Sequence, residues 1–352
     1  MTKFSLSSSF LISILALTVV SRISSFYRRL YETDDDYSSE ISTFSFVESP
    51  NEGKVSSGLL KLLNMEVDCQ LEESGHLVIE GLSCNTGSLG NVFSSLYLSA
   101  LRAFQHNNTF MLHCDEGIDE PGNVLQHYIS NKIWTMNISN NIPDLCQCKL
   151  WPHNCALGLN FAVPMIRETL RQVPPPSDID DVTIHVRCGD ILNNPYMGQY
   201  GYPSYDVYKE NLAPFTSVGL LTATFDETKS RAPDTPLIPV CMELVEDMAQ
   251  YFRDTFPHAT VTIRHTDTVE DAIGRMVHSQ QVWCNPSTFC VFPAIANTGH
   301  AFILKSSLYA FVENIKNEPN ITLVQQDFIN GEKITKEKIG PKAIINWLRS
   351  AI

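Results

Sequence analysis

The second half of the chain alternates short apolar runs with longer segments in which apolar residues recur at helical spacing. The apolar runs have the length of buried strands and lie at 181–187, 237–242, 260–264, 281–284 and 301–304. The segments with helical spacing lie at 204–212, 244–256, 269–280, 288–296 and 342–351. Strands that alternate with helices predict an α/β fold whose parallel sheet is covered by helices on both faces.

The first half of the chain carries a shorter version of the same pattern. The expected elements are a strand, an amphipathic helix, a strand and a second helix, at 76–80, 92–105, 109–114 and 155–173. The first three make one βαβ unit. Three consecutive prolines at 174–176 then interrupt the chain. We therefore predict two Rossmann-like domains, 57–175 and 176–352.

The N-terminal segment 1–25 contains an uncharged stretch from Phe4 to Ser21. It is marginal against the roughly 20 apolar residues of a membrane-spanning helix. The basic residues after it fit poorly with a lumenal C-terminal side, which favours a cleaved signal peptide over a signal anchor. A buried N-terminal helix is the alternative interpretation. The polar and acidic segment 26–56 predicts a flexible stem.

Composition indicates a compartment and excludes one class of partner. Ten cysteines and three acceptor sequons, at Asn107, Asn137 and Asn320, are typical of a disulfide-bonded glycoprotein. They predict the secretory pathway, in the Golgi or ER lumen, with the chain either secreted or membrane-anchored. The net charge of -14 argues against nucleic acid as a partner, because phosphate backbones require a basic face.

The strongest local motif is the run from His185 to Asp190, with the sequence HVRCGD. His185 and Arg187 share one face of the expected strand, and Gly189 allows a sharp turn where that strand ends. Ligands bind at this edge of open α/β sheets, and a guanidinium there can clamp a diphosphate. Arg187 could then stabilise a leaving diphosphate without a metal. The alternative interpretation is an ordinary ion pair between Arg187 and Asp190 in a loop.

Three weaker motifs accompany it. Ser287 stands at the expected start of a helix, where backbone N–H groups can hold a phosphate, although a plain helix cap is the commoner reading. Gly90 and Asn91 end a glycine-containing turn that begins at Gly87. The run from Cys146 to Cys155 has spacing that could hold zinc, but disulfides are favoured in a secreted chain.

These residues together resemble a known family. The pattern His185-x-Arg187-x-Gly189-Asp190 resembles the donor-site motif of the α1,2-, α1,6- and protein O-fucosyltransferases. The glycine-containing turn, the segment 202–208 and Asp271 upstream of 284–289 resemble further features of that family in the same order. The resemblance covers roughly residues 81–301 as scattered motifs.

The resemblance implies a GT-B-like fold, in which the two Rossmann-like domains face a cleft and the second binds the donor. It further implies transfer of fucose from GDP-fucose to a glycan or glycoprotein hydroxyl, with inversion and with no metal or other cofactor required. In this reading His185 and Arg187 contact the phosphates and ribose, and Asp271 accepts hydrogen bonds from guanine. The remaining donor-site residues would be Gly90, Asn91, Ser287, Thr288 and Phe289.

The chain also departs from the family pattern. Cys188 stands where many relatives carry a second arginine, and Phe292 stands where a tryptophan is usual. The stretch 193–196 has no acidic residue, so Asp190 is the nearest candidate for the catalytic base. This departure supports an alternative, a non-catalytic GDP-sugar- or glycan-binding protein on the same fold. A third reading is an unrelated doubly wound α/β protein with chance motifs.

Four charged or ionisable residues lie near the expected donor edge, namely Arg264, His265, Asp267 and Arg275. Each of them is more often a structural or solvated residue than a ligand-binding one. Arg275 follows Asp271 by one helical turn, so the two are expected to pair.

Overall fold

The structure is a computed structural model of the chain. It describes residues 44–47, 59–60, 78–80, 89–105, 110–113, 124, 126–129, 133–134, 159–192, 200–223, 237–306 and 312–350. The predicted signal segment 1–25, the cysteine cluster 146–155 and the stretch 193–196 lie outside the described residues, as do the sequons at Asn107 and Asn137. No helix in the described part of the chain is both long enough and apolar enough to cross a membrane.

A six-stranded, wholly parallel sheet forms the centre of the second half, in the order β12-β11-β10-β6-β8-β9. Its strands are β6 Val182–His185, β8 Ser217–Leu221, β9 Thr260–Arg264, β10 Gln281–Cys284, β11 His300–Leu304 and β12 Ile321–Val324. The chain starts at the central strand β6, builds outward through β8 to β9, and then returns to the other side of β6. This is the strand order of a doubly wound α/β sheet, so the predicted fold class is confirmed for this half.

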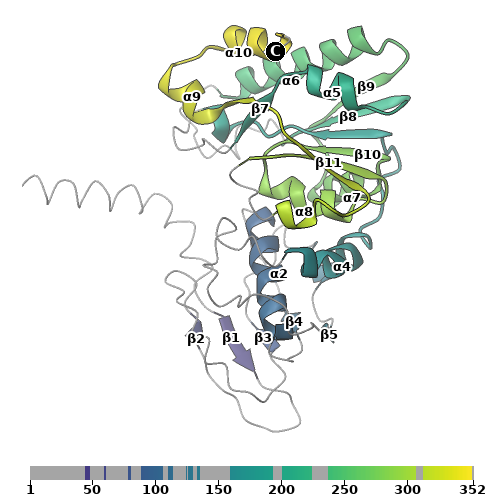
Figure 1. Cartoon of the computed structure of the whole chain (residues 1–352), viewed down its shortest axis with the longest axis vertical. Helices are drawn as coiled ribbons and strands as arrows, with labels where there is room; N and C mark the ends of the chain where they lie inside the picture. Colours follow the sequence, from purple (N-terminus) through teal and green to yellow (C-terminus); the bar gives the residue numbers. More distant parts are fainter. Residues whose placement is uncertain are drawn as a thin grey trace, which may run out of the picture.

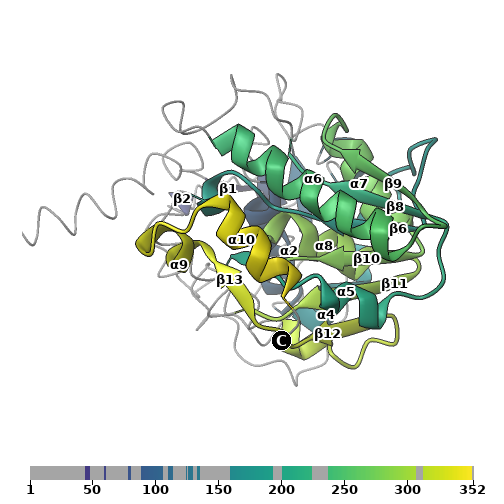
Figure 2. The same cartoon turned by 90° about the horizontal axis from the view of Figure 1, so that it is seen from above.

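Helices cover both faces of the sheet, as Figures 1 and 2 show. One face carries α5 Asp206–Asn211, α6 Leu237–Thr255 and α10 Pro341–Arg349, and the other carries α7 Val269–His278 and α8 Thr288–Ala296. A two-stranded antiparallel ribbon, β7 Gly201–Pro203 with β13 Phe328–Asn330, precedes the short helix α9 Gly331–Lys336. Because helices lie on both faces, the strands β6 and β10 are buried along their whole length.

Two helices of the first half pack against α8. They are α2 Leu89–Gln105 and α4 Leu159–Leu170, the second continuing through Pro164 as predicted. The ring of Phe292 in α8 lies 5.8 Å from that of Phe93 and 5.5 Å from that of Tyr97, both in α2. Helix α8 is therefore enclosed between the sheet and these two helices, which explains its almost uniformly apolar sequence.

The remaining strands of the first half form a separate sheet in the order β2-β1-β3-β4-β5. Their bounds are β1 Phe44–Val47, β2 Leu59–Leu60, β3 Val78–Glu80, β4 Phe110–His113 and β5 Ile133–Trp134. Strands β3 and β4 are parallel and flank α2, which confirms the predicted βαβ unit. The other pairs are antiparallel, and β1 falls inside the segment 26–56.

One predicted strand is wrong. Residues 237–242 open α6, because Pro239 occupies the first helical turn, where its missing N–H costs no hydrogen bond. The prediction also missed β8, whose central Gly219 weakens the strand pattern. A Cβ at Gly219 would overlap the carboxylate of Asp180, so glycine is required there by packing. The strands β1, β2, β5, β7, β12 and β13 and the helix α9 were also not predicted.

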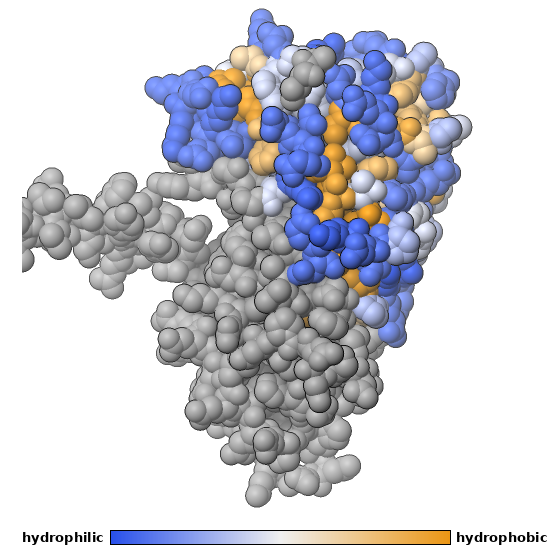
Figure 3. All heavy atoms as spheres, in the orientation of Figure 1, coloured by the Kyte–Doolittle hydropathy of each residue, from blue (hydrophilic) through white to orange (hydrophobic). Residues whose placement is uncertain are grey.

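Hydrophilic side chains dominate the described surface on the face seen in Figure 3, and hydrophobic ones occupy smaller areas. Two disulfides occur among the described residues, Cys188–Cys241 and Cys284–Cys290, and these residues include no free cysteine. Both disulfides lie at the edge of the large sheet where the sequence motifs gather.

Candidate functional site

The strand order brings the two main sequence motifs together. Strands β6 and β10 are neighbours, and their last residues, His185 and Cys284, are paired in register. The chain leaves these two strands in opposite directions along the sheet, so this position is the topological switch point. Ligands of open α/β sheets bind outside the carboxyl ends of the strands at such a point. The runs 185–190 and 285–289 therefore follow adjacent strand ends.

His185 is buried at this edge, with 7% of its surface exposed, and its ring lies 5.8 Å from the ring of Phe289. Burial, helped by the charge of Arg187, lowers the pKa of His185 to about 3. The imidazole is therefore neutral at physiological pH and offers one donor and one acceptor. Its Nδ1 atom has no hydrogen-bond partner among the described residues, which is uncommon for a buried nitrogen and suits a ligand atom.

The buried state of His185 predicts a specific loss of stability in acid. Its pKa is about 3 in the folded chain and about 6.5 when unfolded, so the unfolded chain binds more protons between these values. The contribution is complete above pH 6.5 and falls as the pH drops toward 3. From pH 7 to pH 5 the chain is expected to lose about 2 kcal/mol more unfolding free energy than a His185→Gln variant. Urea unfolding at both pH values measures the difference.

The comparison is between the unaltered chain and His185→Gln, because this substitution removes the titrating imidazole and keeps a polar side chain. Equal pH slopes for the unaltered chain and His185→Gln would show that His185 does not titrate as its burial requires.

Arg187 lies beyond the end of β6 and is half-buried. Its guanidinium carbon Cζ is 4.2 Å from the centroid of the Tyr200 ring, which is the geometry of a cation–π contact. Gly189 turns the chain with a φ of 94°, in the left-handed region that favours glycine. Asp190 then begins a short 3₁₀ helix, Asp190–Leu192, and its side chain lies outside the described residues. The backbone of the predicted base is thus at the edge beside Arg187.

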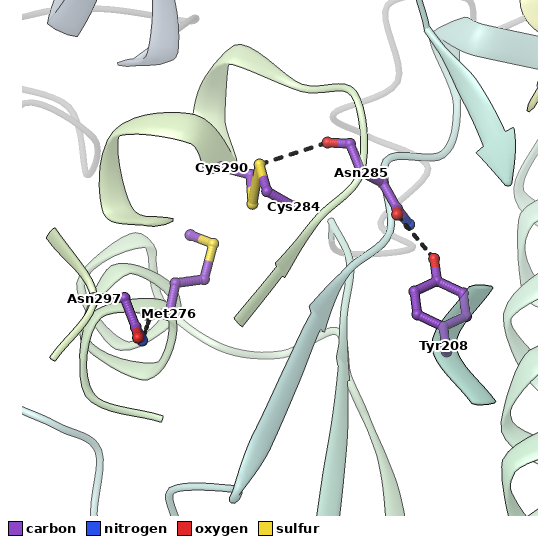
Figure 4. Close-up of a disulfide and its surroundings, with 6 residues drawn as sticks. All are labelled: Tyr208, Met276, Cys284, Asn285, Cys290 and Asn297. Atoms are coloured by element: carbon purple, nitrogen blue, oxygen red, sulfur yellow. Dashed lines mark hydrogen bonds between the residues drawn. A yellow bond between two sulfur atoms is a disulfide. The ribbon is translucent and has the colours of Figure 1, made fainter. Parts of the chain in front are cut away.

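The second motif forms the turn from β10 into α8, which Figure 4 shows. The disulfide Cys284–Cys290 joins the last residue of β10 to the first turn of α8, with the Cα atoms 5.5 Å apart. Within this closed loop the side-chain oxygen of Asn285 accepts a hydrogen bond of 2.8 Å from the Tyr208 hydroxyl. The turn is therefore fixed both covalently and by a buried hydrogen bond.

Ser287 is the N-cap residue of α8, and its side chain does not make the usual capping hydrogen bond. Thr288 and Phe289 are the first helical residues, and Thr288 is buried. The N-terminus of a helix carries partial positive charge and attracts anions. This end of α8 lies beside the buried His185 ring, so the two motifs can act on one ligand.

Gly90 brings the first half of the chain to the same place. It lies in the first turn of α2, and a Cβ there would overlap backbone atoms of Thr288 and Phe289. The predicted glycine-containing turn is thus already helical at Gly90 and Asn91, although the side chain of Asn91 lies outside the described residues. Only a residue without a side chain allows α2 to approach the start of α8 this closely.

Gly90→Ala is expected to destabilise the fold by about 1–3 kcal/mol, because the new methyl group must displace backbone. The sign of the change in unfolding free energy shows whether α2 approaches the start of α8 closely. In a helix without this contact the same substitution would stabilise the chain by up to about 1 kcal/mol. Chemical denaturation of the unaltered chain and the variant measures this change. A stabilised variant would exclude the close approach of α2 to the start of α8.

Asp271 lies in the first turn of α7, which starts just after β9 and at the same edge of the sheet. Its N–H donates to the Thr268 hydroxyl at 3.0 Å, and that hydroxyl donates to the Asp271 carboxylate at 2.8 Å. Strand β9 is two strand spacings from β6, or about 10 Å. Asp271 therefore lies at the same edge of the sheet as His185, in the helix that follows the outermost strand on that side.

The predicted pairing of Asp271 with Arg275 is wrong. The side chain of Arg275 instead turns into the protein and bonds to Asp267 at 2.8 Å, Asp180 at 2.8 Å and Asp178 at 3.0 Å. Arg264 shares Asp178 and Asp180, so Arg264, Asp267 and Arg275 belong to one structural ion cluster. Helical spacing predicted Asp271 as the partner of Arg275. In the structure Arg275 pairs instead with carboxylates that include Asp178 and Asp180, from the segment before β6.

Two further polar atoms, not predicted from the sequence, lie at the same edge of the sheet. Thr222 follows β8 and Ser306 follows β11, and the Oγ atom of each is buried without a hydrogen-bond partner among the described residues. With His185 at the end of β6, they place unpartnered polar atoms at three strand ends. For Thr222, the available signal was a polar residue directly after an apolar run. The described residues contain no group of three or more His, Cys, Asp or Glu side chains placed to hold a metal.

The arrangement can bind an anion and stabilise developing negative charge, since it combines a neutral imidazole, an adjacent guanidinium and a helix N-terminus. Comparison with known proteins adds no further constraint, because no family model, no curated protein and no solved structure matches the chain.

Proposed function

We propose that the chain is a fucosyltransferase, which moves fucose from GDP-fucose to a hydroxyl group of a glycan or glycoprotein. The observation that carries the proposal is the convergence of the His185–Asp190 run and the start of α8 at the switch point of a doubly wound sheet. The same two segments carry the sequence resemblance to the fucosyltransferases.

The reaction is a displacement at the anomeric carbon with inversion. The acceptor oxygen forms a bond to C1 of fucose, and the bond from C1 to the β-phosphate oxygen breaks. The electron pair of that bond stays on the phosphate, so GDP leaves with added negative charge. Arg187 stabilises this charge, together with the N-terminus of α8 at Ser287, Thr288 and Phe289. The acceptor proton passes to a base, for which Asp190 is the nearest candidate.

The proposal assigns the donor and the acceptor to different halves of the chain. Residues 176–352 bind GDP-fucose, with His185 at the phosphates and Asp271 at guanine. Residues 57–175 face them across a cleft in a GT-B-like arrangement, with Gly90 and Asn91 at the donor. The contact of Gly90 with the start of α8 supports this placement. The chain would act in the secretory pathway, held by its N-terminal segment or released from it.

A non-catalytic GDP-sugar- or glycan-binding protein remains the second candidate, because the stretch 193–196 lacks an acid. Donor binding does not separate the two functions, but turnover does. Release of GDP from GDP-fucose in the presence of acceptor glycans identifies the enzyme.

The first test is calorimetric titration of the full chain with GDP, with ADP and UDP as controls and EDTA present. We expect GDP to bind preferentially, and Asp271→Asn to weaken that binding about 10- to 100-fold, because hydrogen bonds to a charged group are lost. Asparagine retains an oxygen that can accept from Thr268, so the start of α7 is preserved.

Glu270→Gln is the matched control, since it removes a charge from the same turn of α7. It should bind GDP nearly as well as the unaltered chain. Absence of any preference for GDP in the unaltered chain would contradict the proposed donor.

A further inference from the structure

We propose that the Cys188–Cys241 disulfide and the ring of Tyr200 are positioning elements that hold the Arg187 guanidinium toward the donor phosphates. The inference rests on the proposed function, because it concerns the same arginine. It gives roles to Cys188, Cys241 and Tyr200, to which neither the sequence motif nor the strand order assigns one.

Arg187 requires positioning because it lies beyond the end of strand β6. Just after β6, the Val186 N–H donates a hydrogen bond of 2.7 Å to the Leu221 carbonyl. Arg187 comes next, and Gly189 then turns the chain with a positive φ. Arg187 thus lies in the loop that follows β6, two residues beyond the end of that strand.

The disulfide supplies a first fixed point. It joins Cys188, the residue after the arginine, to Cys241 near the start of α6, with the Cα atoms 5.7 Å apart. The N–H of Gly189 also donates to Cys241 Sγ, at 2.9 Å, and the Tyr202 hydroxyl donates to Cys188 Sγ at 3.4 Å. Because Cys188 is bonded directly to Arg187 along the backbone, fixing Cys188 limits the positions open to the backbone of Arg187.

Helix α6 is a firm anchor for this link. Its inner face packs into the core through Leu244, Val245, Met248 and Phe252, all of which are buried. Its outer side is joined to α10 by the ion pair of Asp247 with Arg349, at 2.7 Å. The loop is consequently tied to a helix that cannot shift without disturbing the core.

Tyr200 supplies the second fixed point, at the charged end of the side chain. Its ring is largely buried and lies 4.2 Å from Arg187 Cζ. The carbonyl of Tyr200 accepts a hydrogen bond of 3.1 Å from Gly331 N–H, and the adjacent strand β7 pairs with β13. The ring is thus attached to an ordered ribbon. An arginine held at both its backbone and its guanidinium loses less conformational freedom when a diphosphate binds.

The test is a double-mutant cycle on GDP affinity, measured by calorimetry on the full chain in EDTA. Cys188→Ser/Cys241→Ser leaves no free thiol and is expected to weaken GDP binding about tenfold. In an Arg187→Ala background the same pair of substitutions is expected to have little further effect, because the positioned group is absent. An equal loss in both backgrounds would mean a general structural role and would overturn the proposal.

Tyr200 gives a test that leaves the disulfide intact. Tyr200→Leu removes the aromatic face and should weaken GDP binding about three- to fivefold, the size expected for a cation–π contact. Tyr200→Phe keeps the face and should restore most of the affinity. Equal loss in both variants would assign the effect to the hydroxyl and overturn the role of the ring.

A readout without nucleotide separates this inference from the proposed function. Nuclear magnetic resonance of the Arg187 Nε–H group should report a restricted side chain in the unaltered protein and a mobile one in the cysteine variant. That result would uphold the positioning role even if GDP proved not to be the ligand. An Arg187 side chain equally mobile in both proteins would overturn the inference, while preferential GDP binding would leave the proposed function standing.

Discussion

Replacing Arg187 with alanine is expected to lower kcat for fucosyl transfer by about 100-fold or more, while the protein stays folded. The reason is electrostatic. In the proposed reaction a guanidinium at the switch point meets the charge that develops on the departing diphosphate, and one such donor contributes on the order of 3 kcal/mol to the transition state. Steady-state release of GDP from GDP-fucose, with a saturating acceptor, measures the effect.

Arg187→Lys separates charge from geometry. Lysine keeps the positive charge but lacks the planar fork that bonds two phosphate oxygens at once, so an intermediate rate is expected. The thermal midpoint of each variant shows whether the loss reflects unfolding. A near-normal rate for Arg187→Ala would remove this residue from the chemistry and leave it a binding role at most.

The second large effect concerns stability. Arg275→Met is expected to lower the free energy of unfolding by about 3 kcal/mol or more, because it breaks a buried ion cluster. Only 1% of Arg275 is exposed, and it bonds to Asp178, Asp180 and Asp267. Burial alone would lower the pKa of Arg275, but the hydrogen bonds that it donates to its carboxylate partners raise its pKa above the ordinary value, so the cation is retained. Urea unfolding measures the loss.

Arg349→Met is the matched comparison, because Arg349 forms an ion pair with Asp247 while 41% of its side chain is exposed. An exposed pair of this kind contributes at most about 1 kcal/mol. Equal losses for the two arginines would show that the Arg275 cluster is no more important than a surface ion pair.

Sequence predicted the bounds of three elements as the structure has them. They are the strands at 260–264 and 281–284 and the helix at 288–296, of which the first is only partly buried. The run 237–242 fits either a strand or the start of a helix, because six residues are too few to show which period the pattern follows. Strand β8 was not predicted because its central Gly219 is required by contact with the carboxylate of Asp180, which comes from another segment. A requirement set by a tertiary contact leaves no pattern in the local sequence.

The candidate site divides in the same way. The motifs around His185 and Ser287 were found because each is continuous in sequence, and their meeting follows from the strand order. The partners of Arg275 could not be predicted, since two of them lie about 95 residues away. The Cys188–Cys241 disulfide could not be predicted from the sequence either, because ten cysteines allow many pairings.

The close approach of Gly90 to Thr288 and Phe289 limits how this protein can be recombined with others. A chimera that takes its first half from another protein must supply a residue without a side chain at this position. Otherwise the grafted helix will push the start of α8 out of place. Changes to the first half are therefore more safely made by exchanging loops than by exchanging the whole of it.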